Sequence, residues 1–110
     1  MAEIKEINNM EEYEGFISSP GTLNVLKISA SWCGPCRTLG QTIRDLSPED
    51  VEGVLLAEVD ADSGWFEDKL AELGVRGIPA LIAFRDGEEK DRLQGAAPKA
   101  GLLDFFGRNR

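Results

Sequence analysis

Hydrophobic residues recur along this chain in two kinds of segment, and the two kinds alternate. Continuous apolar runs that contain β-branched residues are typical of strands buried on both faces of a sheet. Apolar residues spaced three or four positions apart are typical of helices that bury one face. The alternation of the two patterns predicts an α/β fold.

Five segments carry a strand pattern. They cover residues 4–7, 23–30, 54–59, 80–84 and 88–93. The second is mostly apolar and the third is apolar except for Glu58, which predicts two central strands buried on both faces. The last two flank Asp86-Gly87, a dipeptide that favours a tight turn, so we expect them to form a β-hairpin.

Four segments carry a helix pattern. They begin near residues 8, 34, 66 and 98 and end near 17, 47, 73 and the last residues of the chain. Asn8 and Glu11 are spaced as a capping box for the first, and Gly74 is a C-cap for the third. Pro98 suits the first helical position of the last, whose inward residues should be Leu102, Leu103 and Phe106.

The expected element order is β-α-β-α-β-α-β-β-α. Crossover connections followed by a hairpin imply a mixed β-sheet of about five strands, flanked on both faces by about four helices. A chain of 110 residues has the usual size of one domain, so we expect residues 1–110 to form a single domain.

Charge and composition narrow the range of partners. The net charge of −8 argues against nucleic acid or an anionic membrane as the main partner, because both would repel this surface. No run approaches the roughly 18 apolar residues that a membrane span needs. The first residues are charged rather than apolar, so we expect a cytoplasmic protein rather than an exported one.

Two cysteines and no histidine restrict the chemistry. A structural zinc site takes four ligands, typically Cys or His, and the chain offers two, so we expect no metal. A histidine base and a Cys–His nucleophile are excluded. The spacing of Cys33 and Cys36, two residues apart, favours a redox-active pair over a structural bridge.

The position of the pair explains how it would react. Cys33 precedes the second expected helix and Cys36 lies in its first turn, so both sulfurs lie at the same helix end. Free backbone N–H groups and the helix dipole there favour a thiolate, the species that attacks a disulfide. We expect Cys33 to be the exposed nucleophile and Cys36 the buried resolving thiol, while Pro35 stiffens the turn.

Several motifs, in this order, resemble the thioredoxin family over nearly the whole chain. They are Trp32-Cys33-Gly34-Pro35-Cys36, Arg76-Gly77-Ile78-Pro79, Gly87 and Gly95-Ala96. The resemblance implies a thioredoxin fold and a protein-disulfide reductase that carries electrons in the disulfide itself, with no other cofactor. It also implies a cis peptide bond before Pro79.

The resemblance further implies a flat substrate groove and a set of partners. The groove would be lined by Trp32, Gly34, Pro35, Ile78, Pro79, Gly95 and Ala96. The backbone near Ile78 would pair with an extended segment of the substrate, as in strand addition. The implied partners are disulfide-containing target proteins and a flavin-dependent thioredoxin reductase, and we expect the chain to be a monomer.

Two charged residues depart from the family pattern. Thioredoxins usually have a buried Asp six residues before the first Cys and a Lys on the neighbouring strand, whereas this chain has Lys27 and Glu58 there. We hypothesise a charge-swapped buried pair in which Glu58 accepts a proton from Cys36 and Lys27 lowers the pKa of the thiolate. The alternative is that Lys27 reaches solvent and that Glu58 lies at an exposed strand end. Ser29 also stands where the family often has an aromatic residue.

Two other functions fit the same sequence. Within the same chemistry, the chain would be a disulfide oxidase or isomerase if Lys27 shifts the reduction potential. In a different class, it would be a binding subunit that uses the thioredoxin fold within a larger complex. The intact cysteine pair favours the reductase.

Overall fold

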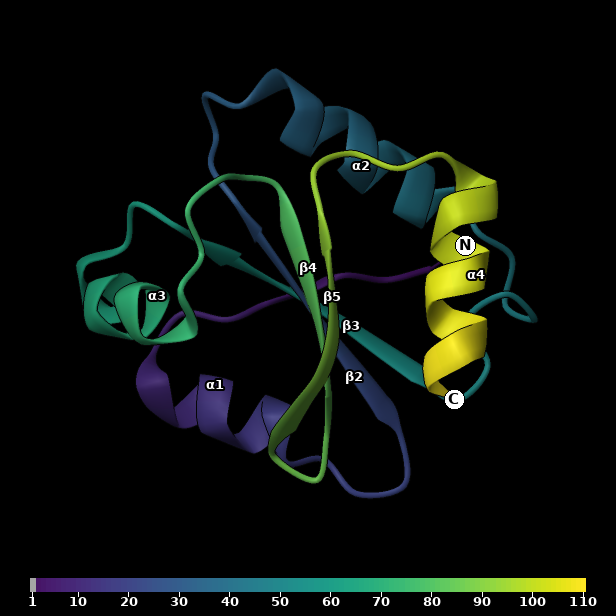
Figure 1. Cartoon of the computed structure of the whole chain (residues 1–110), viewed down its shortest axis with the longest axis horizontal. Helices are drawn as coiled ribbons and strands as arrows, with labels where there is room; N and C mark the ends of the chain where they lie inside the picture. The colour runs from purple at the N-terminus through teal and green to yellow at the C-terminus, as the bar shows by residue number, and fades with distance from the viewer. Residues whose placement is uncertain (1) are drawn as a thin grey trace.

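Five strands form one mixed sheet in the computed structural model, which describes residues 2–110 (Figure 1). They are β1 (Lys5–Glu6), β2 (Leu23–Ser29), β3 (Val54–Asp60), β4 (Ala80–Arg85) and β5 (Glu88–Gln94). Their order is β1-β3-β2-β4-β5, with β2 parallel to β3 and antiparallel to β4. The central strand β2 is buried along its whole length, as its apolar run predicts.

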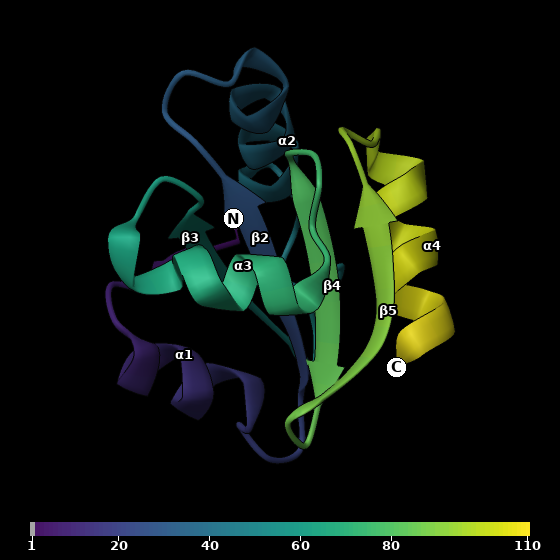
Figure 2. The same ribbon diagram turned by 60° about the vertical axis from the view of Figure 1, so that its left-hand side comes forward.

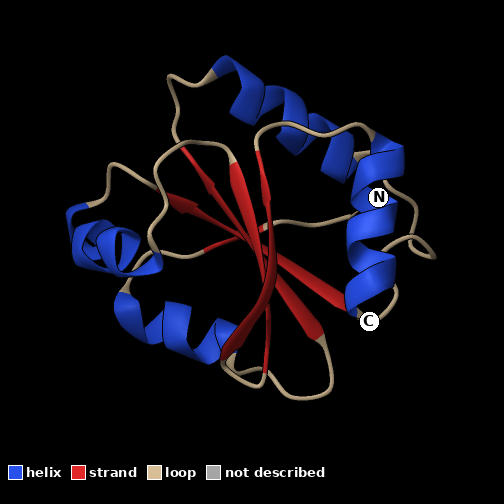
Figure 3. Cartoon of the chain, in the orientation of Figure 1, coloured by secondary structure: helices blue, strands red, loops and turns tan. Residues whose placement is uncertain are grey.

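Helices cover both faces of this sheet. They are α1 (Met10–Ile17), α2 (Gly34–Arg44), α3 (Glu67–Leu73) and α4 (Lys99–Asn109), with a short 3₁₀ turn η1 (Gly64–Phe66) before α3. Figures 1 and 2 show α1 and α3 on one face and α2 and α4 on the other. Figure 3 shows the twisted strands between these two helical layers. The predicted order of elements, the mixed sheet and the helices on both faces are confirmed.

The alternation of side chains along β2 and β3 divides the interior into two cores. Leu23 and Val25 pack with buried residues of α2 and α4, whereas Leu26 and Ile28 pack with those of α1 and η1. By the same alternation Lys27 shares the face of Leu23 and Val25, and Glu58 shares the face of Val54 and Leu56. The two charged side chains therefore lie on the face that α2 covers.

Element boundaries differ from the predictions at three places. The N-cap of α1 is Asn9 rather than Asn8, because the Asn9 side chain accepts a hydrogen bond of 2.8 Å from the backbone N–H of Glu12. Helix α2 ends at Arg44 rather than near Ser47. Pro98 is the N-cap of α4, in an extended conformation, rather than its first helical residue. Gly74 does cap α3, with a φ of 68°.

The prediction that the third strand is buried on both faces was wrong at one position. Leu55 is 41% exposed, although its neighbours Val54 and Leu56 are buried. The shallow pocket around Leu55 is lined in part by Gly15 of α1, which has no side chain to cover it.

No helix within residues 2–110 has both the length and the apolar character needed to cross a membrane.

Candidate active site

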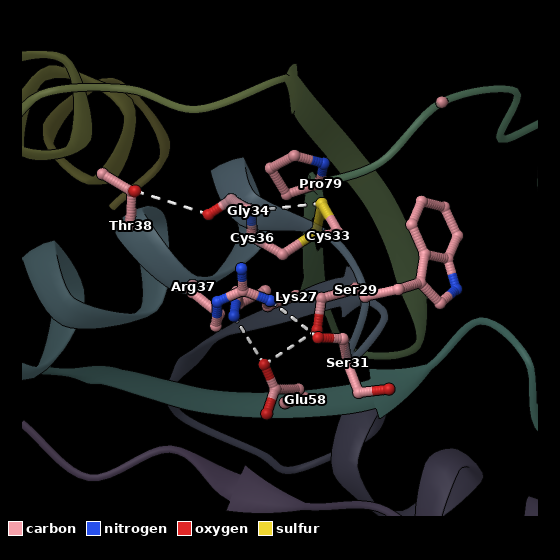
Figure 4. Close-up of a disulfide and its surroundings, with 12 residues drawn as sticks. Lys27, Ser29, Ser31, Cys33, Gly34, Cys36, Arg37, Thr38, Glu58 and Pro79 are labelled. Carbon is pink, nitrogen blue, oxygen red and sulfur yellow. Dashed lines mark hydrogen bonds and ion pairs between the residues drawn. A yellow bond between two sulfur atoms is a disulfide. The ribbon is translucent and has the colours of Figure 1, made fainter.

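The two cysteines lie at the N-terminal end of α2 and are joined by a disulfide (Figure 4). Cys33 is the N-cap, and its Sγ accepts a hydrogen bond of 3.2 Å from the backbone N–H of Cys36. Pro35 lies in the first turn, where its fixed φ suits the helix and its missing N–H costs nothing. The predicted placement of both sulfurs at one helix end is confirmed.

The expectation that Cys33 is exposed was wrong for this oxidised form. Cys33 is 5% exposed and Cys36 is 1% exposed. Both are buried because they pack together with Ala30 of the loop after β2 and with Ile78. Cys33 remains the more accessible of the two cysteines.

A loop before β4 lies against the cysteine pair. The Ile78–Pro79 peptide bond is cis, as the family resemblance implies. Figure 4 shows Pro79 beside Cys33, and Ile78 packs against the cluster that the cysteines form with Ala30. The backbone N–H of Gly95 donates a hydrogen bond of 2.8 Å to the carbonyl oxygen of Pro79, so the structure brings Gly95 to the same site. Ala96 follows it in the chain and is exposed.

Trp32 is the most exposed large hydrophobic residue of the site. Its side chain is 67% exposed, and its indole Nε1 donates a hydrogen bond of 2.7 Å to Oδ2 of Asp62. Burying an exposed aromatic ring is a common source of binding energy at protein interfaces. Gly34 and Pro35 follow Trp32 directly, half-buried and exposed respectively. An accessible surface therefore surrounds the disulfide.

Lys27 and Glu58 form an ion pair beneath the cysteines. They are register partners on β2 and β3, and Nζ of Lys27 lies 2.5 Å from Oε2 of Glu58. The Lys27 side chain is 4% exposed and that of Glu58 is 28% exposed. Lys27 therefore does not reach solvent, and the pair that we hypothesised from the sequence forms.

The Glu58 carboxylate is held in its ionised form. Burial raises the pKa of Glu58, but hydrogen bonds from Lys27 and Ser29 and the charges of Lys27 and Arg44 outweigh it, so the pKa lies below its usual value. Ser29 is 6% exposed, and its hydroxyl donates a hydrogen bond of 2.9 Å to Oε2 of Glu58. A carboxylate with a lowered pKa is a weak base at neutral pH.

A solvent-open cavity of about 520 Å³ connects this ion pair with Cys36. It is lined by Lys27, Ser29 and Glu58 together with Cys36, and by Arg37 and Arg44 of α2. Figure 4 shows Lys27 and Ser29 between the disulfide and Glu58. Protons exchanged near Cys36 therefore have a polar route to solvent.

Three residues of the site were not identified from the sequence. Ser29 hydrogen-bonds Glu58, Asp62 holds the Trp32 indole, and the Gln94 Nε2 donates to the carbonyl oxygens of Gly77 (2.9 Å) and Pro79 (3.3 Å). Ser29 offered a signal, because it is a polar residue at the end of an apolar strand. The other two contacts join segments that are far apart in the chain.

Within residues 2–110 no group of three or more His, Cys, Asp or Glu side chains is placed to hold a metal ion.

A bridged cysteine pair at a helix N-terminus, facing a cis-proline loop on a mixed sheet, defines a thiol–disulfide oxidoreductase. The sequence model of the thioredoxin family matches residues 4–108. This chain belongs to the thioredoxin family, and it is a protein-disulfide reductase of that family. Thioredoxins use a redox-active disulfide rather than a separate cofactor.

Individual relatives agree with this assignment. The chain is 32% identical over 99 residues to thioredoxin C-2 of Corynebacterium nephridii, covering 90% of each protein. It is 34% identical over 98 residues to a thioredoxin of Chlamydia caviae, covering 89% of this chain and 91% of the relative. The crystal structure of Fasciola hepatica thioredoxin matches with a TM-score of 0.83 at 29% identity, over 97% of this chain and all of the other.

Proposed function

We propose that the chain reduces protein disulfides by two successive exchanges, with Cys33 as the attacking sulfur and Cys36 as the resolving sulfur. The observation that carries this proposal is the Cys33–Cys36 disulfide at the start of α2, which is the oxidised product of such a cycle. Because Cys33 is the N-cap, its sulfur lies at the positive end of the helix dipole. This position stabilises a thiolate in the reduced protein.

In the first exchange the Cys33 thiolate attacks one sulfur of a target disulfide. A bond forms between Cys33 and that sulfur, and the other target sulfur leaves as a thiolate. In this proposal the target chain binds to the surface next to the disulfide. The residues that would bind it are Trp32, Gly34, Pro35, Ile78, Pro79, Gly95 and Ala96. The backbone of Ile78, held against the cysteines, would pair with an extended target segment.

In the second exchange Cys36 attacks the Cys33 sulfur of the mixed disulfide. The Cys33–Cys36 bond forms, the second target sulfur leaves as a thiolate, and two electrons have passed to the target. Cys36 must first lose its proton. We assign two contributions to this step: the Lys27 ammonium favours the Cys36 thiolate electrostatically, and Glu58 accepts the proton across the shared cavity.

The lowered pKa of Glu58 limits its role as a proton acceptor. An ionised Glu58 is available to accept a proton, but it holds that proton weakly and would pass it on to solvent. An ionised Glu58 partly offsets the charge of the Lys27 ammonium, so the ammonium favours the Cys36 thiolate most once Glu58 has accepted the proton.

The oxidised chain must be reduced again after each turnover. A flavin-dependent thioredoxin reductase is the partner we propose for this step, as for thioredoxins in general. The cycle then carries electrons from that reductase to target proteins, in a reducing compartment such as the cytoplasm. We propose that residues 1–110 act as one domain and as a monomer.

The buried position of Lys27 supports a second candidate function, that of a disulfide oxidase or isomerase. A buried cation that stabilises thiolates stabilises the reduced protein, and this raises the reduction potential of the pair. Equilibration of the chain with a thiol buffer of known potential distinguishes the two directions. A potential near that of reducing thioredoxins supports the reductase, and a potential near that of disulfide isomerases supports the alternative.

The reduction of insulin disulfides, with dithiothreitol as the electron source, tests the proposed activity. The wild-type chain should accelerate precipitation of the reduced insulin chains in proportion to its concentration. The Cys33→Ser and Cys36→Ser variants should not. If the Cys33→Ser variant accelerates the reaction as well as the wild type, the assignment of Cys33 is wrong.

A further inference from the structure

Gly40 of α2 lies one helical turn after Cys36, on the same buried face of the helix. A Cβ atom at position 40 would lie 3.1 Å from the Lys27 ammonium nitrogen and 3.4 Å from both terminal nitrogens of Arg44. The distance to Lys27 is shorter than most real Cβ contacts, whereas the distances to Arg44 are at the lower end of ordinary van der Waals contact. The missing side chain therefore leaves the space beside the helix that the Lys27 ammonium needs.

At the other helical glycines a Cβ atom would meet no atom closer than 3.5 Å. At Gly15 of α1 and Gly107 of α4, a Cβ atom would meet no other atom within 4 Å. Glycine in a helix interior is less stable than alanine, because the backbone loses more freedom on folding. The glycine at position 40 therefore leaves room beside α2 for the buried Lys27 ammonium.

We propose that Gly40 is a positioning residue that fixes the Lys27 ammonium one turn from Cys36. The inference rests on the proposed role of Lys27 in favouring the Cys36 thiolate, and it adds the residue that holds Lys27 in place. Two features define the position of the ammonium: the Glu58 carboxylate at 2.5 Å and the backbone at Gly40, where a Cβ atom would lie 3.1 Å from Nζ.

An alanine at position 40 would displace the ammonium. Its methyl group would lie 3.1 Å from Nζ, so the ammonium would have to move by a few tenths of an ångström away from α2, the helix that carries Cys36. A displaced cation stabilises the Cys36 thiolate less, because a charge interaction weakens with distance. Gly40→Ala should therefore raise the pKa of Cys36, without any change in the charge of the protein.

The test uses a background in which Cys36 is the only thiol. In the Cys33→Ser protein, the ultraviolet absorbance of the thiolate is followed as a function of pH, and its midpoint is the pKa of Cys36. Gly40→Ala, Lys27→Met and Gly107→Ala are each added to this background. Gly107→Ala is the matched control, because it makes the same change in an exposed helix position with open space around it.

Gly40→Ala should shift the Cys36 pKa upward, by less than Lys27→Met does, because the ammonium moves but is not removed. Gly107→Ala should leave the pKa unchanged. With Lys27→Met already present, Gly40→Ala should add no further shift. If Lys27→Met raises the pKa and Gly40→Ala does not, the inference about Gly40 is overturned while the role of Lys27 stands. If neither variant changes the pKa, the role of Lys27 is wrong, and the inference fails with it.

A second measurement covers the case in which Gly40→Ala does not fold. Methionine at position 27 ends one atom earlier than lysine and carries no charge, so the Gly40→Ala, Lys27→Met double variant should fold. Recovery of the native circular dichroism spectrum in the double variant supports the close contact between these positions. Failure of the double variant to fold, when Lys27→Met alone folds, would overturn it.

Discussion

The ammonium of Lys27 lies 2.5 Å from Oε2 of Glu58, between register partners on adjacent parallel strands of the sheet. The ammonium is almost fully buried, and the carboxylate accepts a second hydrogen bond from Ser29. Removing one member of such a pair leaves a buried charge without its partner, which is costly. The pair thus links the stability of the fold to the charge environment of Cys36.

Glu58→Gln should destabilise the protein. The amide cannot neutralise the buried ammonium, and we expect a loss of about 2 kcal/mol in the free energy of unfolding, below the range for fully buried pairs because Glu58 is partly exposed. Urea denaturation at neutral pH measures the change. Glu88→Gln is the control, since Glu88 pairs with Lys90 at the surface, and it should cause no measurable loss. Equal effects of the two variants would contradict a structural role for the buried pair.

The contribution of Glu58 to stability should depend on pH in the acid range. The pKa of Glu58 is lowered in the folded protein, from a value of about 4.3 in an unfolded chain. Its contribution is therefore complete above about pH 4.3 and is lost as the pH falls through the lower folded value. The difference in unfolding free energy between the wild type and Glu58→Gln should shrink over that range. A difference that stays constant down to pH 2 would show that Glu58 is not the titrating group.

Trp32→Ala should weaken the binding of protein targets while leaving the fold intact. The indole is mostly exposed, so we expect the free energy of unfolding to change by less than about 0.5 kcal/mol. The KM for a protein disulfide should rise about tenfold, equivalent to about 1.4 kcal/mol. Leu55→Ala is the control, because Leu55 is also an exposed large hydrophobic residue but lines a pocket with α1, away from the cysteines. A similar rise in KM for Leu55→Ala would argue against a specific role for Trp32.

Gln94→Ala should loosen the loop that carries Ile78 and Pro79. The Gln94 amide donates to two carbonyl oxygens of that loop, and its loss should raise the KM for protein disulfides about threefold, by removal of roughly one net hydrogen bond. Gln94→Glu should have a larger effect, because a carboxylate repels those oxygens. Reduction of a small disulfide without a peptide chain is the control reaction. If both variants slow that control reaction to the same extent, Gln94 acts on the cysteines rather than on target binding.

The sequence predicted most of the architecture, because the hydrophobic pattern carries it. The apolar run at residues 23–30 gave the central strand, and the turn at Asp86-Gly87 gave the hairpin. Boundaries shifted where backbone capping decides them. Asn9 rather than Asn8 caps α1, since the hydrogen bond to Glu12 depends on local backbone angles that residue types alone do not specify.

The candidate site was predicted less completely. The cysteines and the ion pair followed from local signals, since Lys27 and Glu58 are single charges in apolar runs. Three other contacts depend on proximity between segments that are distant in the chain. They are the close approach of Lys27 to Gly40, the hydrogen bonds of Gln94 to the loop before β4, and the hydrogen bond of Trp32 to Asp62. The low exposure of Cys33 likewise results from packing against Ile78 of another loop.

Trapping of the mixed disulfide shows which of the two cysteines attacks the target. Reduced Cys36→Ser and Cys33→Ser variants are mixed with a protein disulfide, quenched with acid and measured as intact masses. Cys36→Ser should gain the mass of one target chain, because Cys33 attacks and no resolving thiol releases the target. Cys33→Ser should gain none over the same time. Adducts that form only on the Cys33→Ser variant, or equally on both, would contradict the assignment of Cys33 as the attacking sulfur.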